Sequence, residues 1–311
     1  EGNLVAFSGP DFKATFDKQS GLLTSYLYKK HEYILNGQGP RPFFWRAPTD
    51  NDYGANLPVR LKAWKEASYQ EPKAESFQVT PGSNATTVKV TYRFPQTEAR
   101  WNITYKIYAS GVIKVDNRFM AEGDQAPMIP RVGLRMQLPE SFTDLTYYGR
   151  GPKENYRDRR TSQFIGEYAI PVKDMYEPYV RPQENNHRTD IYWCALTDKT
   201  QRGLLLIADR TFELNASNYP LESMDSGDTI DNGAPRTEKT HHRHLTDPLP
   251  EKMVDLFIDY RMMGVGGDDS WGATAHEPYL IRPGKENAIE YGFSLVPFDK
   301  KEDYKYLIQQ Y

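Results

Sequence analysis

The chain has 311 residues, of which 38% are hydrophobic and 13% aromatic, enough for the core of a large globular fold. Its 39 basic and 42 acidic residues give a formal net charge of −3, and neither sign forms a long run, which argues against nucleic acid or an anionic membrane as the main partner. No apolar stretch approaches the roughly 20 residues that a membrane-spanning helix needs.

The single cysteine, Cys194, excludes an intrachain disulfide and a thiolate cage for a metal. It lies in the apolar run Trp193–Ala195, so we predict a buried structural thiol. The chain begins at Glu1 with neither a signal peptide nor an initiator methionine. We therefore expect a C-terminal piece of a longer protein, whose cellular compartment the sequence leaves open.

The start of the chain alternates apolar and polar side chains, as half-buried strands do. We predict a hairpin of Leu4–Phe7 and Phe12–Phe16, followed across the turn Asp17–Gly21 by a strand at Leu22–Tyr28. The next distinctive stretch, Arg41–Asp52, contains prolines, which disfavour a helix or a central strand. Its three large aromatic side chains and two arginines predict a segment held by packing and ion pairs.

The best candidate for a helix is Leu57–Ala67. Asn56 can cap its N-terminus, and Pro58 suits its first turn. Leu57, Leu61 and Trp64 fall on one face of such a helix, which predicts that this face is buried.

Beyond this helix, alternation and β-branched or aromatic residues indicate strands almost throughout. We predict them at Thr86–Phe94, Trp101–Tyr108, Val112–Phe119, Arg131–Leu138, Ile191–Leu196, Gly203–Ala208, Val254–Tyr260 and Ala288–Phe298. Many short strands at regular spacing with one short helix indicate an all-β fold. We expect a large antiparallel β-sandwich that forms a single domain over residues 1–311.

A glycine-rich loop follows the predicted strand Val254–Tyr260. Three glycines occur within Gly264–Gly267, where the backbone can take positive φ or approach other groups closely. They precede Asp268, Asp269 and Trp271. An indole on such a loop is either packed into its own domain or exposed as a flat surface on which a sugar can stack.

Asp268 and Asp269 are poor candidates for catalysis. A retaining glycosidase needs two carboxyl groups that face each other about 5–5.5 Å apart, whereas neighbours in an extended loop point in different directions. A calcium site would use similar ligands, but the alternating spacing of an EF-hand is missing. We expect the two carboxylates to cap the loop or to form hydrogen bonds within it.

The middle of the chain holds a dense group of charges, Arg150, Glu154, Asp158 and Arg159. Such a group can bind an acidic sugar, but the long polar loops of a β-sandwich also need ion-paired partners. We favour the second interpretation, in which the group is a corner that holds two loops together.

Histidines offer two further possibilities. In a strand, His242 and His244 would share one face beside His241, but no third metal ligand is evident, so solvated or core-edge histidines are expected. A sugar epimerase would need a histidine and a carboxylate as an acid–base pair in an open cleft. The only pairing that the sequence offers is His187 or His244 with Glu184.

Several of these segments resemble motifs of the glycoside hydrolase family 2 β-galactosidases, in the same order along the chain. The family's RAPxDND, YGxGPxENYxDR, DMYxPYxxPxEN and SHRH motifs and its C-terminal tryptophan loop correspond here to Arg46–Asp52, Tyr148–Arg159, Asp174–Asn185, His241–His244 and Gly264–Trp271. The resemblance runs from the first predicted strand to the last. It concerns the family's C-terminal domain, which is also called the small chain or domain 5.

The resemblance implies a β-sandwich of galactose-mutarotase-like topology. It also implies that Trp271, with Asp268 and Asp269, binds the β-galactoside at the mouth of the active site. The family's catalytic glutamates and magnesium ligands lie in an upstream (β/α)8 barrel, which this sequence lacks. We therefore expect this chain to contain no catalytic residue, metal site or cofactor. Magnesium and sodium would bind to the barrel, its partner in a homo-oligomeric parent enzyme.

The leading hypothesis is thus a domain that shapes the active-site mouth of a β-galactosidase and cleaves no bond alone. Two alternatives stay open. A free-standing sugar mutarotase or epimerase would share the implied topology. A carbohydrate-binding module would need several exposed aromatic residues rather than one.

Overall fold

The structure, a computed structural model, describes residues 2–123, 127–227, 244–269, 271–300 and 302–310. Its named strands form two sheets, and every pairing between named strands is antiparallel. The prediction of an all-β antiparallel fold is confirmed. No helix in these ranges is both long enough and apolar enough to cross a membrane.

The smaller sheet has four strands in the order β1 (Leu4–Ser8), β2 (Phe12–Asp17), β3 (Leu23–Tyr28) and β4 (His31–Glu32). The larger sheet has twelve strands. In chain order these are β5 (Arg41–Phe43), β6 (Ala74–Thr80), β7 (Ala85–Phe94), β8 (Ala99–Tyr108), β9 (Ile113–Ala121), β10 (Arg131–Pro139), β11 (Asp144–Gly151), β12 (Phe164–Pro171), β13 (Arg188–Thr197), β14 (Gly203–Ser217), β15 (Met253–Met262) and β16 (Ile289–Phe298).

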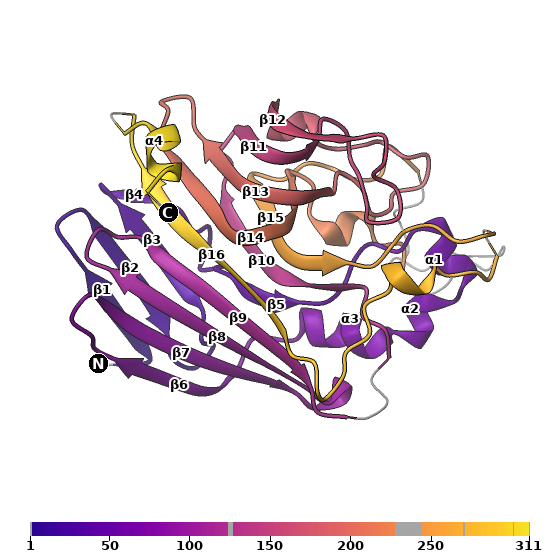
Figure 1. Cartoon of the computed structure of the whole chain (residues 1–311), viewed down its shortest axis with the longest axis horizontal. Coiled ribbons are helices and arrows are strands. Elements are labelled where there is room, and N and C mark those ends of the chain that lie inside the picture. Colours follow the sequence, from indigo (N-terminus) through magenta and orange to yellow (C-terminus); the bar gives the residue numbers. More distant parts are fainter. Residues whose placement is uncertain (1, 124–126, 228–243, 270, 301, 311) are drawn as a thin grey trace.

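The long strand β14 decides how the larger sheet is layered. Its first half, Gly203–Ala208, pairs with β16, whereas its second half, Glu213–Ser217, pairs with β15. The path β12-β11-β13-β14-β16-β9-β8-β7-β6 therefore branches at β14, through β15 and β10 to β5 (Figure 1). Strands β10 and β15 are buried on both faces along most of their length, which places this branch in the interior of the fold.

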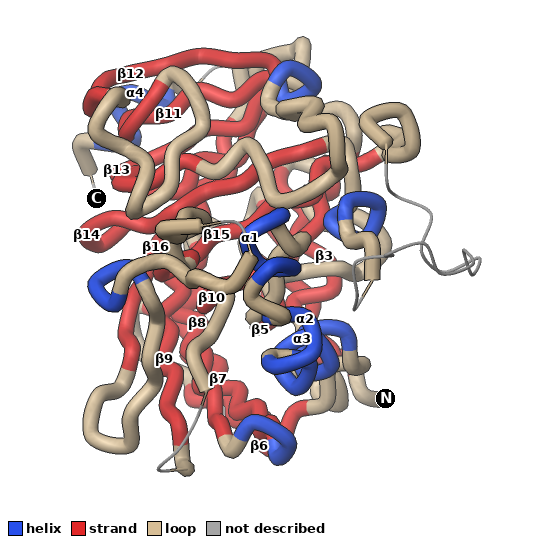
Figure 2. The backbone as a smooth tube through the Cα atoms, turned by 90° about the vertical axis from the view of Figure 1, so that its right-hand side faces the viewer, coloured by secondary structure: helices blue, strands red, loops and turns tan. Residues whose placement is uncertain are grey.

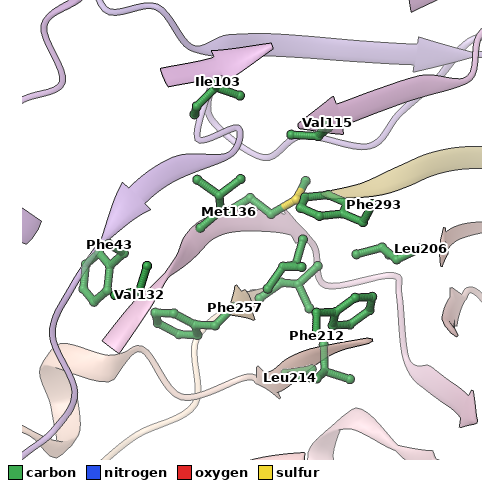
Figure 3. Close-up of a cluster of buried hydrophobic side chains, with 14 of the residues drawn as sticks. Phe43, Ile103, Val115, Val132, Met136, Leu206, Phe212, Leu214, Phe257 and Phe293 are labelled. Carbon is green, nitrogen blue, oxygen red and sulfur yellow. The ribbon is translucent and has the colours of Figure 1, made fainter. Parts of the chain in front are cut away.

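The hydrophobic core lies around this interior branch. Strands β7, β8 and β9 alternate buried and more exposed residues, so one face of each packs inward. Figure 3 shows where side chains from seven strands meet, and the residues labelled there are Phe43, Ile103, Val115, Val132, Met136, Leu206, Phe212, Leu214, Phe257 and Phe293. Burying each of these side chains stabilises the fold by about 1.5–3 kcal/mol. The predicted buried thiol is also confirmed, because Cys194 is fully buried.

The predicted single helix is wrong in its extent. The structure has α1 (Asp50–Gly54), α2 (Leu57–Arg60), α3 (Lys62–Tyr69) and α4 (Tyr304–Ile308), with single-turn 3-10 helices η1 (Pro95–Thr97), η2 (Val172–Asp174), η3 (Leu221–Met224) and η4 (Glu277–Tyr279). Leu61 separates α2 from α3 because its backbone (φ −111°, ψ 17°) is not helical. Asn56 occupies the N-cap position in the left-handed region without a capping hydrogen bond from its side chain. Leu57, Leu61 and Trp64 are buried, as their spacing predicts.

The proline-containing stretch 41–52 also differs from expectation. Pro42 lies in β5, and the last three residues of the stretch belong to α1, which begins at Asp50. Pro42 is tolerated because β5 is short and pairs with β10 alone. Strands β4, β6, β11 and β12 were not predicted. For β11 the reason is its turn-forming residues, Gly149 and Gly151, which the pairing with β12 accommodates.

Loops and the short helices α1 and α2 gather at the end of the molecule opposite the two termini (Figure 1). Figure 2 looks onto this end and shows α1, α2 and α3 with loops in front of the strands. Parts of four segments that resemble family motifs, 46–52, 148–159, 174–185 and 264–271, lie together here.

Candidate functional site

The loop after β15 is held at its base by Asp158. Val265 and Gly266 donate their backbone N–H groups to the Asp158 carboxylate, at 3.1 and 2.7 Å. Residue 264 needs to be glycine because a Cβ atom there would lie 2.5 Å from an Asp158 oxygen. No glycine of the segment 264–267 has positive φ. Close approach to Asp158, rather than left-handed backbone, therefore explains a glycine at position 264.

Arg46 is the second anchor of this loop. Its guanidinium binds both oxygens of Asp52, with Nε–Oδ2 and Nη2–Oδ1 distances of 2.9 and 2.7 Å. It also donates to the carbonyl oxygens of Met263 at 2.7 Å and Gly264 at 3.0 Å. Arg46 is 2% exposed and Asp52 is 5% exposed. The ion pair of Arg46 and Asp52 lies within the 41–52 segment and confirms that an ion pair holds it. The hydrogen bonds of the same guanidinium to Met263 and Gly264 join this segment to the glycine loop.

Helix α1 orients this ion pair through a reciprocal cap. The Thr49 hydroxyl accepts the Asp52 N–H at 3.1 Å, and the Asp52 carboxylate accepts the Thr49 N–H at 3.0 Å. Within the same turn, Asn51 donates its side-chain amide to the carbonyl of Val265 at 3.0 Å. These roles were not predicted, although the spacing Thr49-x-x-Asp52 is the signal of such a cap.

The tip of the loop is organised by Asp269. Its Oδ1 atom accepts the backbone N–H groups of Trp271, Gly272 and Ala273, at 3.0, 2.9 and 3.0 Å. These backbone hydrogen bonds, that from Ala273 foremost, lower the pKa of Asp269. Asp268 instead binds Nε2 of His276 at 2.8 Å. Both carboxylates are therefore engaged within the loop, in different directions.

Trp271 itself is 79% exposed. Its indole has no ring contact and no hydrogen bond with any part of the chain that the structure describes. The interpretation in which this tryptophan is packed into its own domain is therefore wrong for this chain. The exposed indole stands on a loop whose base is fixed from two sides by Arg46 and Asp158.

The charge group of the middle region is a corner between loops, though with different partners than expected. Glu154 pairs with Arg159 and accepts the backbone N–H of Asn186 at 2.7 Å. Arg150 pairs with Asp190, at 2.7 Å, rather than with another member of the group. Because Asp158 binds the glycine loop, this corner ties the ENYRDR stretch to two other loops.

His187 does not pair with Glu184. It is fully buried, with Nε2 3.0 Å from Glu213 Oε2 and Nδ1 2.6 Å from Asn215 Oδ1. Glu184 instead lies near Arg131 and accepts a hydrogen bond from the Asn215 amide at 2.9 Å. The predicted acid–base pair of His187 and Glu184 is wrong, because strand β14 places Glu213 beside the imidazole.

The partners of His187 determine its protonation. The Asn215 amide nitrogen donates to Glu184 and to the carbonyl of Asn185, at 2.9 and 2.8 Å, which fixes its oxygen toward the ring. Both ring nitrogens therefore face acceptors, an arrangement that favours the doubly protonated imidazole. Burial lowers the pKa of His187, but the hydrogen bond and charge of Glu213 outweigh burial and raise it overall. The ring is thus a buried group whose partners stabilise its protonated form.

Among the described residues, no group of three or more His, Cys, Asp or Glu side chains could hold a metal. His244 is exposed, and its backbone N–H donates to Asp247 at 2.9 Å. His241 and His242 lie outside the described residues, so their predicted role stays a prediction.

We expect the folded domain to lose stability as the pH rises through neutrality. Burial raises the pKa of Asp259 to about 7 despite the nearby charges of Arg131 and His187, and neither of its oxygens accepts a hydrogen bond. Asp259 and His187 thus both bind protons more tightly when folded. Their contribution is fully present below the unfolded pKa values, near 4 and 6.5, and is lost as the pH rises through the folded ones.

The measurement is the free energy of unfolding in denaturant at pH 5.5 and at pH 8.5. We expect a decrease of about 2–4 kcal/mol between the two values. Asp259→Asn removes one of the two titrations and should flatten the profile. An equally steep profile in this variant would show that Asp259 is not responsible.

Comparison with known proteins shows the family. A family profile described as beta galactosidase small chain matches residues 8–295. The chain belongs to the β-galactosidase small-chain family. The small-chain domain is 34% identical over 277 residues to the β-galactosidase of Priestia megaterium, which covers 89% of this chain and 25% of that protein. It is 30% identical over 294 residues to the β-galactosidase of Halalkalibacterium halodurans, with 94% and 27% covered. The domain thus spans about a quarter of the length of these relatives.

Solved structures support the fold of the small-chain domain. The galactose 1-epimerase of Lactobacillus acidophilus aligns with 96% of this chain and 98% of its own at a TM-score of 0.50 and 7% identity. A candidate aldose 1-epimerase of Escherichia coli K12 aligns with 95% and 99% at a TM-score of 0.51 and 10% identity. At such identity the likeness concerns the fold alone, and it confirms the galactose-mutarotase-like topology.

Proposed function

We propose that the small-chain domain forms one wall of the active-site mouth in a glycoside hydrolase family 2 β-galactosidase. The observation that carries this proposal is Trp271, which is 79% exposed on a loop whose base is hydrogen-bonded to Arg46 and Asp158. A sugar face packs well against an exposed indole, and a fixed base reduces the entropy lost when the ligand binds. Asp269 contributes by shaping the loop tip, and Asp268 stays accessible for a hydrogen bond to a sugar hydroxyl.

Bond cleavage is assigned to another part of the enzyme. Asp268 and Asp269 bind different groups of their own loop, so they do not form the opposed pair that a retaining glycosidase needs. The β-galactoside, the catalytic barrel, its magnesium and sodium ions and a homo-oligomeric assembly all belong to the proposal for the whole enzyme. The relatives' names and the coverage of a quarter of their length support it.

The epimerase alternative has lost one of its two proposed acid–base pairs, that of His187 with Glu184. His187 is fully buried and bound to Glu213, so a sugar cannot reach the imidazole. A carbohydrate-binding module would need several exposed aromatic side chains on one surface. Among the described residues, the other aromatic side chains that are more than 60% exposed, Phe164 and Tyr306, lie on β12 and α4 rather than on the Trp271 loop.

We expect the purified 311-residue chain not to hydrolyse o-nitrophenyl β-galactoside, whereas the full-length enzyme does. The reason is the missing pair of opposed carboxylates. The chain is produced in a host without a β-galactosidase of its own, and release of nitrophenol is followed. Turnover that survives in the Asp268→Asn/Asp269→Asn double variant would refute the proposal. Polarimetry on fresh α-galactose is the companion measurement, and clear acceleration of mutarotation would favour the epimerase alternative.

A further inference from the structure

A large hollow, separate from the Trp271 loop, lies on the outer face of the larger sheet. It has a volume of about 1020 Å³ and crosses β6, β7, β8, β9 and β16, which are neighbours in the lower part of Figure 1. The opposite wall comes from the middle of β14, from the end of β15, and from Arg157, Arg160 and Asp190. No residue of the loop 264–271 lines it. We call this hollow the sheet groove; the Trp271 site does not account for it.

The sheet side of the groove presents short, uncharged polar side chains. They come from alternate positions of neighbouring strands and are Ser76, Gln78, Thr91, Asn102 and Thr104. Thr91 donates to the Asn102 side chain at 2.9 Å, which orients this amide. Hydroxyl and amide groups that both donate and accept hydrogen bonds suit the hydroxyls of a saccharide.

The carboxylates of the sheet groove are already neutralised. Each of the five pairs with a cationic side chain; these carboxylates are Asp116, Asp190, Asp209, Glu213 and Glu290. In contrast, Lys89, Arg210 and Arg261 line the groove without a carboxylate partner anywhere in the described chain. Among the described residues, the groove therefore has three cationic side chains without a carboxylate partner, and all five of its carboxylates are ion-paired.

Two cations of the wall, Arg157 and Arg261, each lie against a neighbouring side chain. Glu213 is 3% exposed, and its Oε1 atom lies 3.5 Å from Arg157 while its Oε2 atom is occupied by His187. The guanidinium of Arg261 lies 4.9 Å from the centre of the Tyr260 ring. Arg157 and Arg261 are thus positioned before any ligand arrives, and this lowers the entropic cost of binding.

We propose that the sheet groove binds an oligosaccharide that carries a carboxylate or sulfate group. The anionic group would bind Arg210 and Arg261, and the neutral sugar units would lie on the polar sheet face. A single-stranded nucleic acid fits less well, because it needs several stacking surfaces and a large excess of cations. The groove has six cationic and five acidic side chains, and the Tyr291 hydroxyl is already bound to the Ile258 carbonyl. The proposal does not depend on the role of Trp271.

The test is titration calorimetry on the 311-residue chain with 3′-sialyllactose, 3′-sulfolactose and unmodified lactose. These probes share the neutral disaccharide and differ in the anionic group. We expect at least one acidic probe to bind about tenfold or more tightly than lactose, and its affinity to fall as salt is raised. Which of the two binds better identifies carboxylate or sulfate as the preferred group.

Arg210→Ala and Arg261→Ala should each weaken binding of the acidic probe about tenfold. The matched control is Lys18→Ala, an exposed cation outside the groove, which should leave the affinity unchanged. The melting temperature of each variant shows that it remains folded. Equal affinity for lactose and the acidic probes, no binding of either acidic probe, unchanged affinity in both arginine variants, or tighter binding of a deoxythymidine oligonucleotide would each overturn the proposal.

Discussion

Replacing Trp271 by alanine is expected to raise the KM of the full-length enzyme for a β-galactoside about ten- to a hundredfold. Stacking of the indole is worth about 0.5–1.5 kcal/mol beyond burial, the buried area adds to it, and about 1.4 kcal/mol corresponds to a factor of ten. The loss should appear mostly in KM, because a surface that holds substrate before chemistry contributes ground-state binding. Steady-state kinetics on the wild type and the variant provide the measurement.

The exposure of Trp271 sets the control. A side chain that is 79% exposed contributes little to the folded domain, so the melting temperature of Trp271→Ala should stay close to that of the wild type. Phe164→Ala is the matched variant, because Phe164 is 72% exposed on β12 and outside the loop, and its KM should not change. A wild-type KM in Trp271→Ala, together with a clearly lowered melting temperature, would exclude the stacking role.

Arg46→Ala is expected to lower the free energy of unfolding by about 3–5 kcal/mol. The variant leaves the buried Asp52 carboxylate without its counterion, and an unpaired buried charge is costly. It also removes the two hydrogen bonds to the carbonyls of Met263 and Gly264. Denaturant unfolding of the 311-residue chain measures the loss, and the full-length variant should show a raised KM because its tryptophan loop has lost one anchor.

Arg118→Ala is the matched control for this experiment. Arg118 pairs with Glu290 at 3.0 Å, but both side chains are more than half exposed, so water screens their attraction. An exposed pair contributes about 0–1 kcal/mol. If Arg46→Ala lowers the free energy of unfolding no more than Arg118→Ala does, the buried Arg46 side chain is not what holds the 41–52 segment to the glycine loop.

The positions of most strands follow from the sequence because their cause is local. Alternation of apolar and polar residues marks β7, β8 and β9 whatever they pair with, since one face of each must be buried. The missed strand β11 shows the limit of this reasoning. Its glycines are tolerated because β12 supplies the pairing that local preference does not, while β13 pairs with the half of β11 that precedes them.

The candidate site divides in the same way. Glycine spacing and the motif resemblance identify the loop that carries Trp271, and they identify the charged corner around Glu154. The sequence does not show whether the indole is buried, because the same loop could fold back onto its own domain. It also misassigns the partner of His187, because Glu184 is near in sequence whereas Glu213 arrives on a different strand.

The sequence by itself determined the fold class, the order of the motifs and the presence of an unusual tryptophan loop. Only the tertiary structure decided that Arg46 would reach the carbonyls of Met263 and Gly264, more than 200 positions away in the chain. The physical reason is that burial patterns depend on neighbouring residues, whereas side-chain partners depend on how distant strands are placed. Here the pairing of β15 with β10 and β14 sets where the loop begins, and Arg46 and Asp158 fix it there.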